Sequence, residues 1–214
     1  YTPNKKIYNV KGNFTMIGNT NLTLQNYSNT STNGNNQMVY VDVDNVNSTF
    51  NSSSATLRLL ADNGTELTNC YNIVYAGLYW TGRVSDSNNS ETFTATKGNS
   101  TKTLNKRKIL LRKGTNPYVE FTAGTNDIYF PTTGDGRMFT AYAEVTDYVR
   151  NNGIGEYFVA DIAALQGSGG GDIGKYAGWG LVVIYENSNL KNRDITVFDG
   201  HAYVRESQTL SYDI

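Results

Sequence analysis

Two stretches of the chain are apolar on both alternating faces, which is the pattern of a β-strand buried on two sides. Residues 73–82 read Ile-Val-Tyr-Ala-Gly-Leu-Tyr-Trp-Thr-Gly, and residues 181–185 read Leu-Val-Val-Ile-Tyr. A strand with two apolar faces needs cover above and below the sheet. The sequence therefore predicts two central strands, at 73–82 and 180–186, with other elements packed over both faces. Gly77 marks a point of close approach in the first of them.

The rest of the chain alternates apolar and polar positions over short segments that end in turn residues. Between residues 38 and 44, for example, valines alternate with Tyr40, Asp42 and Asp44. Further segments of this kind lie at 55–60, 92–96, 106–112, 118–123, 138–143 and 157–162. Short strands at regular spacing are typical of a sandwich or a barrel. One helical turn is expected at 145–150, with Thr146 able to cap it and Gly153 just beyond its end.

These patterns predict an all-β fold. We expect residues 1–214 to form a single domain, a jelly-roll-like antiparallel β-sandwich with at most one or two short helical turns. No ~18-residue apolar run is present, so we expect no membrane insertion. The lone Cys70 cannot form an internal disulfide, and we expect it to be a small buried residue.

Composition narrows the possible partners. Lys and Arg number 18 against 19 Asp and Glu, so no net charge draws the chain to nucleic acid, and we expect no nucleic-acid partner. Charged residues make up only 17% of the chain, so its many Asn, Thr, Ser and Gly residues must keep it soluble. Such surfaces are common on secreted β proteins.

A glycine-rich loop from Gly167 to Gly180 contains a misleading motif. Residues 169–175 match the first part of a P-loop, but Tyr176 stands where Ser or Thr should bind magnesium. A β-like run follows where a P-loop has a helix, so we expect a loop that leads into a buried strand, without nucleotide binding.

An oxygen-rich segment is the candidate metal site. Asp42 and Asp44 should project from one face of one strand, beside Asn45 and Asn47, and hard oxygen ligands at this spacing suit calcium. The segment lacks the glycine and glutamate of an EF-hand loop. We therefore expect either a calcium ion or a dense hydrogen-bond cage at residues 42–47.

Other candidate chemistry is weaker. Trp80 and Trp179 could form a sugar-stacking platform, but each lies in a dense apolar run, which favours core packing. His201 is the only histidine of the chain, and the serine-hydrolase motif Gly-x-Ser-x-Gly is absent. Carboxylate pairs for glycoside hydrolysis exist in principle, namely Glu120 or Glu144 with Asp161, but the sequence does not place any two at the required ~5–10 Å. We expect no enzyme.

Two resemblances add to this picture. Glu144–Val149, followed by Gly153, Gly155 and an aromatic strand, is similar to galactose-binding-like jelly rolls, in which a short helical turn bridges the two sheets. The second resemblance rests on residues 40–44, 49–55, 75–83, 176–186 and 194–200. Together these segments look like a domain near the start of large, repeat-rich surface proteins of Bacteroidetes, which include gliding-motility adhesins exported by the type nine secretion system.

The resemblances imply a location and a function. We expect a fragment of a longer precursor at the bacterial cell surface: a non-catalytic extracellular adhesin module that mediates attachment or gliding, or caps a repeat stalk. Its partners would be surface glycans, other cell-surface proteins or adjacent repeat domains of the same chain. A carbohydrate-binding module is the first alternative, and a glycoside hydrolase-like enzyme is the second.

Overall fold

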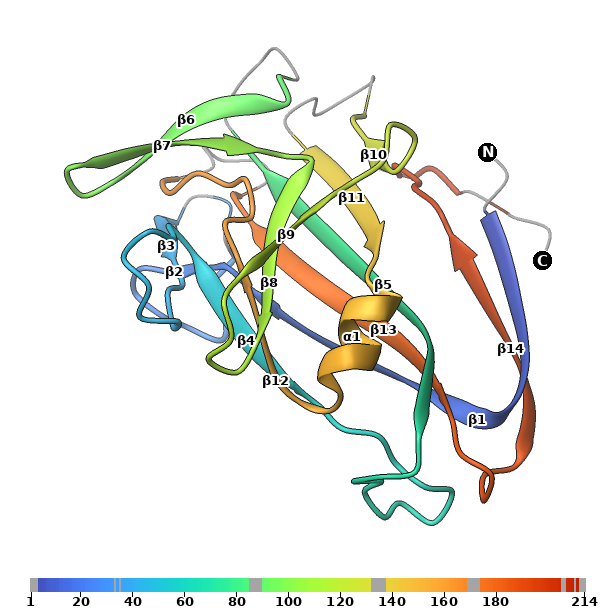
Figure 1. The fold of residues 1–214 in the computed structure, drawn as a ribbon. Helices are drawn as coiled ribbons and strands as arrows, with labels where there is room; N and C mark the ends of the chain where they lie inside the picture. The colour runs from blue at the N-terminus through green and yellow to red at the C-terminus, as the bar shows by residue number, and fades with distance from the viewer. Residues whose placement is uncertain are drawn as a thin grey trace.

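The fold consists almost entirely of β-strands. The computed structural model describes residues 4–32, 34, 36–84, 90–131, 138–168, 174–204, 207–209 and 211. The strands in this part of the chain are β1 (Asn4–Thr20), β2 (Leu22–Leu24), β3 (Met38–Tyr40), β4 (Ser52–Leu57), β5 (Asn72–Arg83), β6 (Thr92–Lys97), β7 (Ser100–Asn105), β8 (Lys108–Lys113), β9 (Val119–Thr122), β10 (Ile128–Tyr129), β11 (Met138–Glu144), β12 (Gly155–Ala160), β13 (Ala177–Glu186) and β14 (Asn192–Asp199). Helix α1 (Thr146–Asn152) is the one α-helix of the described ranges (Figure 1).

Two large antiparallel sheets have jelly-roll connectivity. The first has the order β10-β11-β5-β13-β1-β14, and the second has the order β4-β12-β8-β9. Pairing is nested along the chain: β1 pairs with β13, β4 with β12, β5 with β11, and β8 with β9. This nesting is how one long antiparallel ribbon folds over into two facing sheets. The predicted all-β, jelly-roll-like antiparallel sandwich with a short helix is confirmed.

The two strands that are apolar on both faces lie side by side at the centre of the first sheet. β13 pairs with β5 from Ala177 opposite Gly82 to Glu186 opposite Asn72. The prediction of two central strands is therefore confirmed. Gly77 also behaves as expected, because a Cβ added there would lie 2.3 Å from the hydroxyl of Tyr75.

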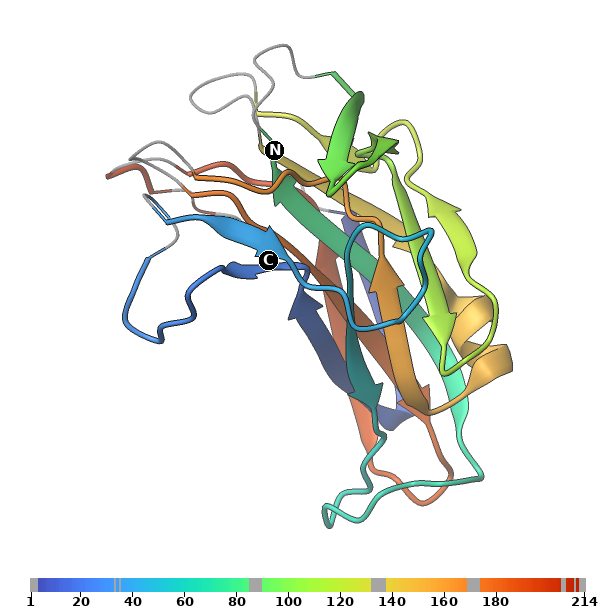
Figure 2. The ribbon, with the colours of Figure 1, turned by 90° about the vertical axis from the view of Figure 1, so that its left-hand side faces the viewer.

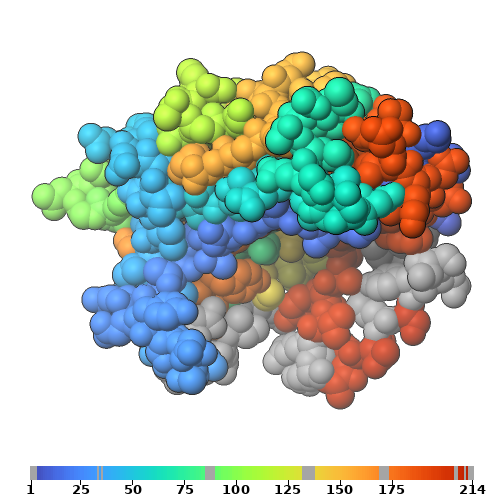
Figure 3. Space-filling view, turned by 90° about the horizontal axis from the view of Figure 1, so that it is seen from below, coloured from blue at the N-terminus to red at the C-terminus, as the bar shows by residue number. Residues whose placement is uncertain are grey.

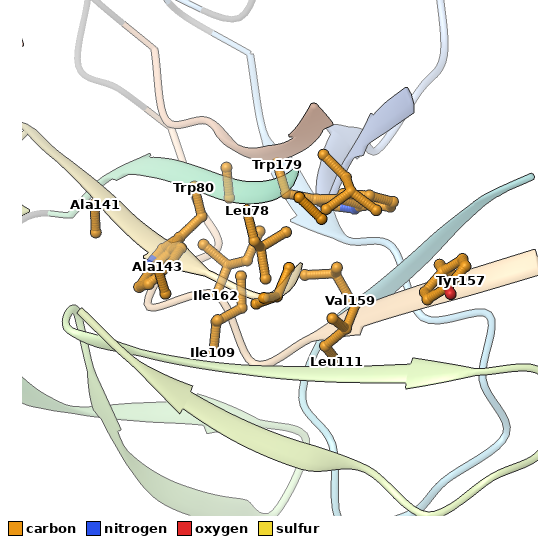
Figure 4. Packing of buried hydrophobic residues seen from close by; sticks show 14 of the residues in the cluster. Leu78, Trp80, Ile109, Leu111, Ala141, Ala143, Tyr157, Val159, Ile162 and Trp179 are labelled. Carbon is orange, nitrogen blue, oxygen red and sulfur yellow. The ribbon is translucent and has the colours of Figure 1, made fainter. Parts of the chain in front are cut away.

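The main core lies between the two sheets. Figure 4 shows Leu78 and Trp80 of β5 packed towards Ile109 and Leu111 of β8 and Val159 of β12. The indole NH of Trp80 donates to the carbonyl of Lys106 at 2.9 Å. The indole NH of Trp179 donates to the hydroxyl of Ser53 at 2.8 Å. Both tryptophans belong to the core, as their apolar sequence context favoured, and neither forms an exposed stacking platform.

The first sheet curls into a half-barrel because β1 changes partner along its length. Residues 4–11 of β1 pair with β14, and residues 12–20 pair with β13. At the change of partner, a Cβ on Gly12 would lie 2.1 Å from the carbonyl oxygen of Tyr185, so only glycine permits this approach. As a result, β14 and the first half of β1 turn away from the second sheet (Figure 1).

Helix α1 connects β11 of the first sheet with β12 of the second, as the galactose-binding-like resemblance implied. Val149 of the helix is buried. Gly153 ends the helix with a φ of 69°, and its NH donates to the Val149 carbonyl. The expected cap is wrong, since Val145 is the N-cap residue. The Thr146 hydroxyl instead accepts from the NH of Ala76 at 3.0 Å, and so fastens the helix to β5.

Two local predictions are also wrong. Cys70 is exposed, in a turn where its φ is 56°, and is not a buried apolar residue. The segment 38–44 is a strand only as far as Tyr40, and Asp42 makes a single β-bridge to Ser52. In the part of the chain that the structure describes, no helix has the length and apolarity needed to span a bilayer.

Candidate functional site

The curled sheet encloses a groove on the face that points away from the sandwich core. Along β13, alternate residues face this side, and they are Gly178, Gly180, Val182 and Ile184. Two adjoining cavities of about 500 and 410 Å³ lie over them, and Tyr79 lines both. The loop after β2 and the chain after β14 project to this side (Figure 2) and flank a hollow floored by β5, β11 and β13 (Figure 3).

One end of the groove, here named the polar end, combines several polar side chains with a lining that is otherwise mostly apolar. It is lined by the side chains of Tyr79, Thr140 and His201, together with the neighbouring Thr81 and Asn19. The Thr140 hydroxyl and His201 Nδ1 share a hydrogen bond, and the imidazole ring stacks on Tyr129 with 5.8 Å between ring centroids. These contacts bring the chain after β14 to β10 and β11 and close the half-barrel at this end.

Burial shifts the titration of two groups at the polar end. It lowers the pKa of His201, because the imidazolium form loses hydration, although the negative charges of Asp199 and Asp127 oppose the shift. Burial also raises the pKa of Asp199, and the positive charges of His201 and Lys6 oppose that shift. Burial therefore favours the neutral form of both groups beside the groove.

Two glycines form part of the floor of the polar end, where a larger residue would fill the groove. A Cβ added to Gly180 would meet nothing closer than the Ile17 carbonyl oxygen at 3.9 Å, so a side chain there would project into open space. At Gly178 the nearest atom would be the Asn19 carbonyl oxygen at 3.2 Å. The absence of side chains at these two positions gives the groove its depth.

The other end of the groove is apolar. Phe14 and Met16 of β1 lie directly opposite Ile184 and Val182 in the strand register. Their exposed fractions are 53% and 66%, which is high for such large apolar side chains. Ile195 and Val197 of β14 also line this cavity, together with Tyr79, Thr196 and Phe198.

A tyrosine cluster closes the half-barrel below the apolar end. The hydroxyl of Tyr75 lies 3.1 Å from that of Tyr79 and donates to that of Tyr142 at 3.2 Å. The ammonium of Lys6 lies 4.8 Å from the centroid of the Tyr75 ring and bonds Glu144 at 3.0 Å. This network ties the beginning of β1 to β5 and β11 and holds the curl in place.

Among the predicted metal residues, Asp44 lies in a cage of hydrogen-bond donors. The carboxylate of Asp44 is buried and accepts from the Tyr118 hydroxyl at 2.6 Å, the Val46 NH at 2.9 Å and the Thr49 hydroxyl at 3.0 Å. Burial alone would raise the pKa of Asp44, but these donors outweigh it and lower that pKa.

The partners of Asp42 come from two other elements. Its carboxylate pairs with the ammonium of Lys97 and accepts from the Ser52 hydroxyl at 3.0 Å. Asn45, with a φ of 56°, and Asn47 are both exposed nearby. Calcium at Asp42, Asp44, Asn45 and Asn47 stays a prediction, and within the described ranges no three Asp, Glu, His or Cys side chains gather as metal ligands would.

Two of the candidate carboxylates lie at one cavity. Glu120 and Asp161 both line a space of about 360 Å³ between the β6–β7 hairpin and β8. Lys108 bonds Glu120 at 2.6 Å, and Lys102 pairs with Asp161, so each carboxylate has an ammonium partner. Glu144 lies elsewhere, beside Lys6. Of the P-loop-like residues 169–175, residues 169–173 lie outside the described residues.

Sequence reasoning missed the groove. The available signal was the alternate face of β13, where two glycines precede Val182 and Ile184, together with Phe14 and Met16 two positions apart on β1. Comparison of the chain with protein-family models, with curated proteins and with solved structures gave no match.

Proposed function

We propose that this protein is a non-catalytic adhesion module of a bacterial surface protein, and that it attaches by holding a carbohydrate in the groove of the curled sheet. The observation that carries the proposal is the groove's polar end, where Tyr79, Thr140 and His201 surround a glycine floor.

The chemistry of this end suits a sugar. Sugar rings present hydroxyl groups at their edges and C–H groups on their faces, so they pair with polar side chains and aromatic rings together. Tyr79 supplies a ring and a hydroxyl, while Thr140 and His201 supply further polar atoms. A cavity of about 500 Å³ is also within the usual ~300–1,000 Å³ of small-ligand sites.

The low content of charged residues and the resemblance of five segments to Bacteroidetes surface proteins support the extracellular setting. The ion pairs at Glu120 and Asp161 support a non-catalytic role, because an ammonium partner holds each carboxylate and neither lines the groove. Binding without turnover is therefore the expected activity.

The test is to fill the groove without disturbing the fold. In Gly180→Leu the new side chain projects into open space over the floor, so we expect the variant to fold and to lose at least tenfold in affinity for any glycan that the wild-type chain binds on an array. Gly180→Ala leaves most of the space free and should lose less. Thr56→Leu, at the exposed position of β4 in the other sheet, is the remote control and should bind like the wild type.

Three outcomes would overturn the proposal. Equal glycan binding by wild type and folded Gly180→Leu would place the ligand elsewhere. Cleavage of the bound glycan during long incubation would make the protein a hydrolase. A wild-type chain that adheres to cells yet binds no glycan on the array would favour a protein partner.

A further inference from the structure

The polar and apolar ends form one continuous groove along a single strand face. Gly178 and Gly180 floor the polar cavity, and Val182 and Ile184 floor the apolar one. Alternate residues of a strand follow each other by about 6.8 Å on one face, so the floor from Gly180 to Ile184 extends for about 14 Å. Tyr79 stands at the junction and lines both cavities.

The apolar half of the groove has walls as well as a floor. Phe14 and Met16 of β1 lie next to the β13 floor, and Ile195 and Val197 come from β14, beyond the bend of β1. The curl of the sheet thus brings apolar side chains from two strands around a space of about 410 Å³. We refer to this space between the strands as the channel.

The apolar lining is unusual for this chain. Elsewhere most exposed strand positions carry Thr, Asn or Lys, with Ile7 and Val119 as apolar exceptions, whereas Phe14 and Met16 follow each other on one strand face beside the groove and are both more than half exposed. Large apolar side chains that gather at a concave site are typical of ligand contact. The polar end alone can hold a sugar, and the apolar end adds a second, different specificity.

We propose that the groove takes an amphiphilic glycoside: a sugar at the Tyr79, Thr140 and His201 end that carries a linear aliphatic chain along Phe14, Met16 and Val182. The inference rests on the proposed function, since it adds a chain to the sugar assigned there. A linear chain fits because the floor of the groove follows one face of β13 from Gly180 to Ile184, in line with the polar end. Glycolipids and alkylated sugars share this chemistry.

The test compares matched glycosides by titration calorimetry. We would use the methyl and n-octyl β-glycosides of glucose, galactose and mannose below their micelle concentrations, with n-octanol as the sugar-free probe. Each buried methylene improves affinity by about threefold to fourfold, so burial of three should make one octyl glycoside at least tenfold tighter than its methyl partner. Octanol alone should bind more weakly than that octyl glycoside.

Variants assign the effect to the channel. Met16→Gln with Val182→Thr keeps side-chain size but makes the lining polar, so it should remove the octyl advantage and leave methyl glycoside binding unchanged. Ile7→Gln is the matched control, because Ile7 is 63% exposed on the opposite face of the same strand. It should keep the full octyl advantage.

The outcomes separate this inference from the proposed function. Equal affinity for methyl and octyl glycosides, both lost in Gly180→Leu, would overturn the amphiphile and leave the glycan site intact. Octyl binding that is unchanged in the Met16→Gln/Val182→Thr variant would also overturn it, since the chain would lie elsewhere. Absence of binding by every glycan and glycoside, octyl forms included, would overturn both.

Discussion

The two faces of the six-stranded sheet are built from the same strands and differ in how completely they are filled. On the inner face, Leu78, Trp80 and Trp179 pack against the second sheet and are almost fully buried. On the outer face, the same strands carry tyrosines, glycines and half-exposed apolar residues around an open groove. Along each of these strands, neighbouring residues point to opposite faces of the sheet.

This difference separates stability from binding. Close packing between the sheets holds the fold together, because each buried apolar side chain there contributes to the free energy of folding. The outer face leaves space that the protein itself does not fill. Substitutions on the inner face should therefore change stability, and substitutions in the open part of the groove should change binding.

The largest expected effect is the loss of an inner-face side chain. Leu78 is completely buried, so Leu78→Ala should lower the free energy of unfolding by about 2–5 kcal/mol. Met16→Ala, in the open groove, should change it by less than about 0.5 kcal/mol. Urea unfolding of both variants checks this, and similar losses in the two would show that the groove belongs to the core.

A smaller effect distinguishes two glycines on the outer face. A Cβ at Gly77 would lie 2.3 Å from the hydroxyl of Tyr75, whose ring is buried and fixed by hydrogen bonds, so Gly77→Ala should cost about 1–3 kcal/mol. Gly180→Ala meets no such obstacle and should be neutral or slightly stabilising. Thermal melting measures both, and an unperturbed Gly77→Ala would mean that the tyrosine cluster can relax.

Much of the fold could be predicted from the sequence because the two central strands have unmistakable apolar faces. The alternating segments and the turn before Gly153 also carried enough signal to predict a jelly-roll-like sandwich. The ends of strands were less predictable: β1 extends over 17 residues because two different strands support its halves, and no local pattern encodes that change of partner.

The candidate sites were harder to predict because they depend on distant partners. Alternation predicted Asp42 and Asp44 on one strand face, but β3 already ends at Tyr40. Lys97 of β6 pairs with the Asp42 carboxylate, and Tyr118, just before β9, donates to that of Asp44. The prediction for Cys70 followed the general tendency of cysteine to be buried. In the structure a turn with positive φ leaves Cys70 exposed. The groove exists only because the sheet curls, which is a property of tertiary structure.

The smallest expected effect is a pH dependence of folding stability that arises from the outer face. His201 is the only histidine in the chain, it lies at the groove, and burial lowers its pKa in the folded state despite the nearby Asp199 and Asp127. Below its ordinary value of about 6.5, the unfolded chain therefore binds more protons than the folded one, and stability falls as the pH falls. Asp199 acts in the opposite sense at lower pH, because its raised pKa stabilises the fold in acid and that gain is lost as the pH rises through the shifted value.

Between pH 7.5 and 5.5 we expect the histidine to dominate. The free energy of unfolding should fall by less than about 1 kcal/mol, since one pKa unit corresponds to about 1.4 kcal/mol. His201→Gln should flatten this slope in urea unfolding, and an unchanged slope would assign it to groups away from the groove.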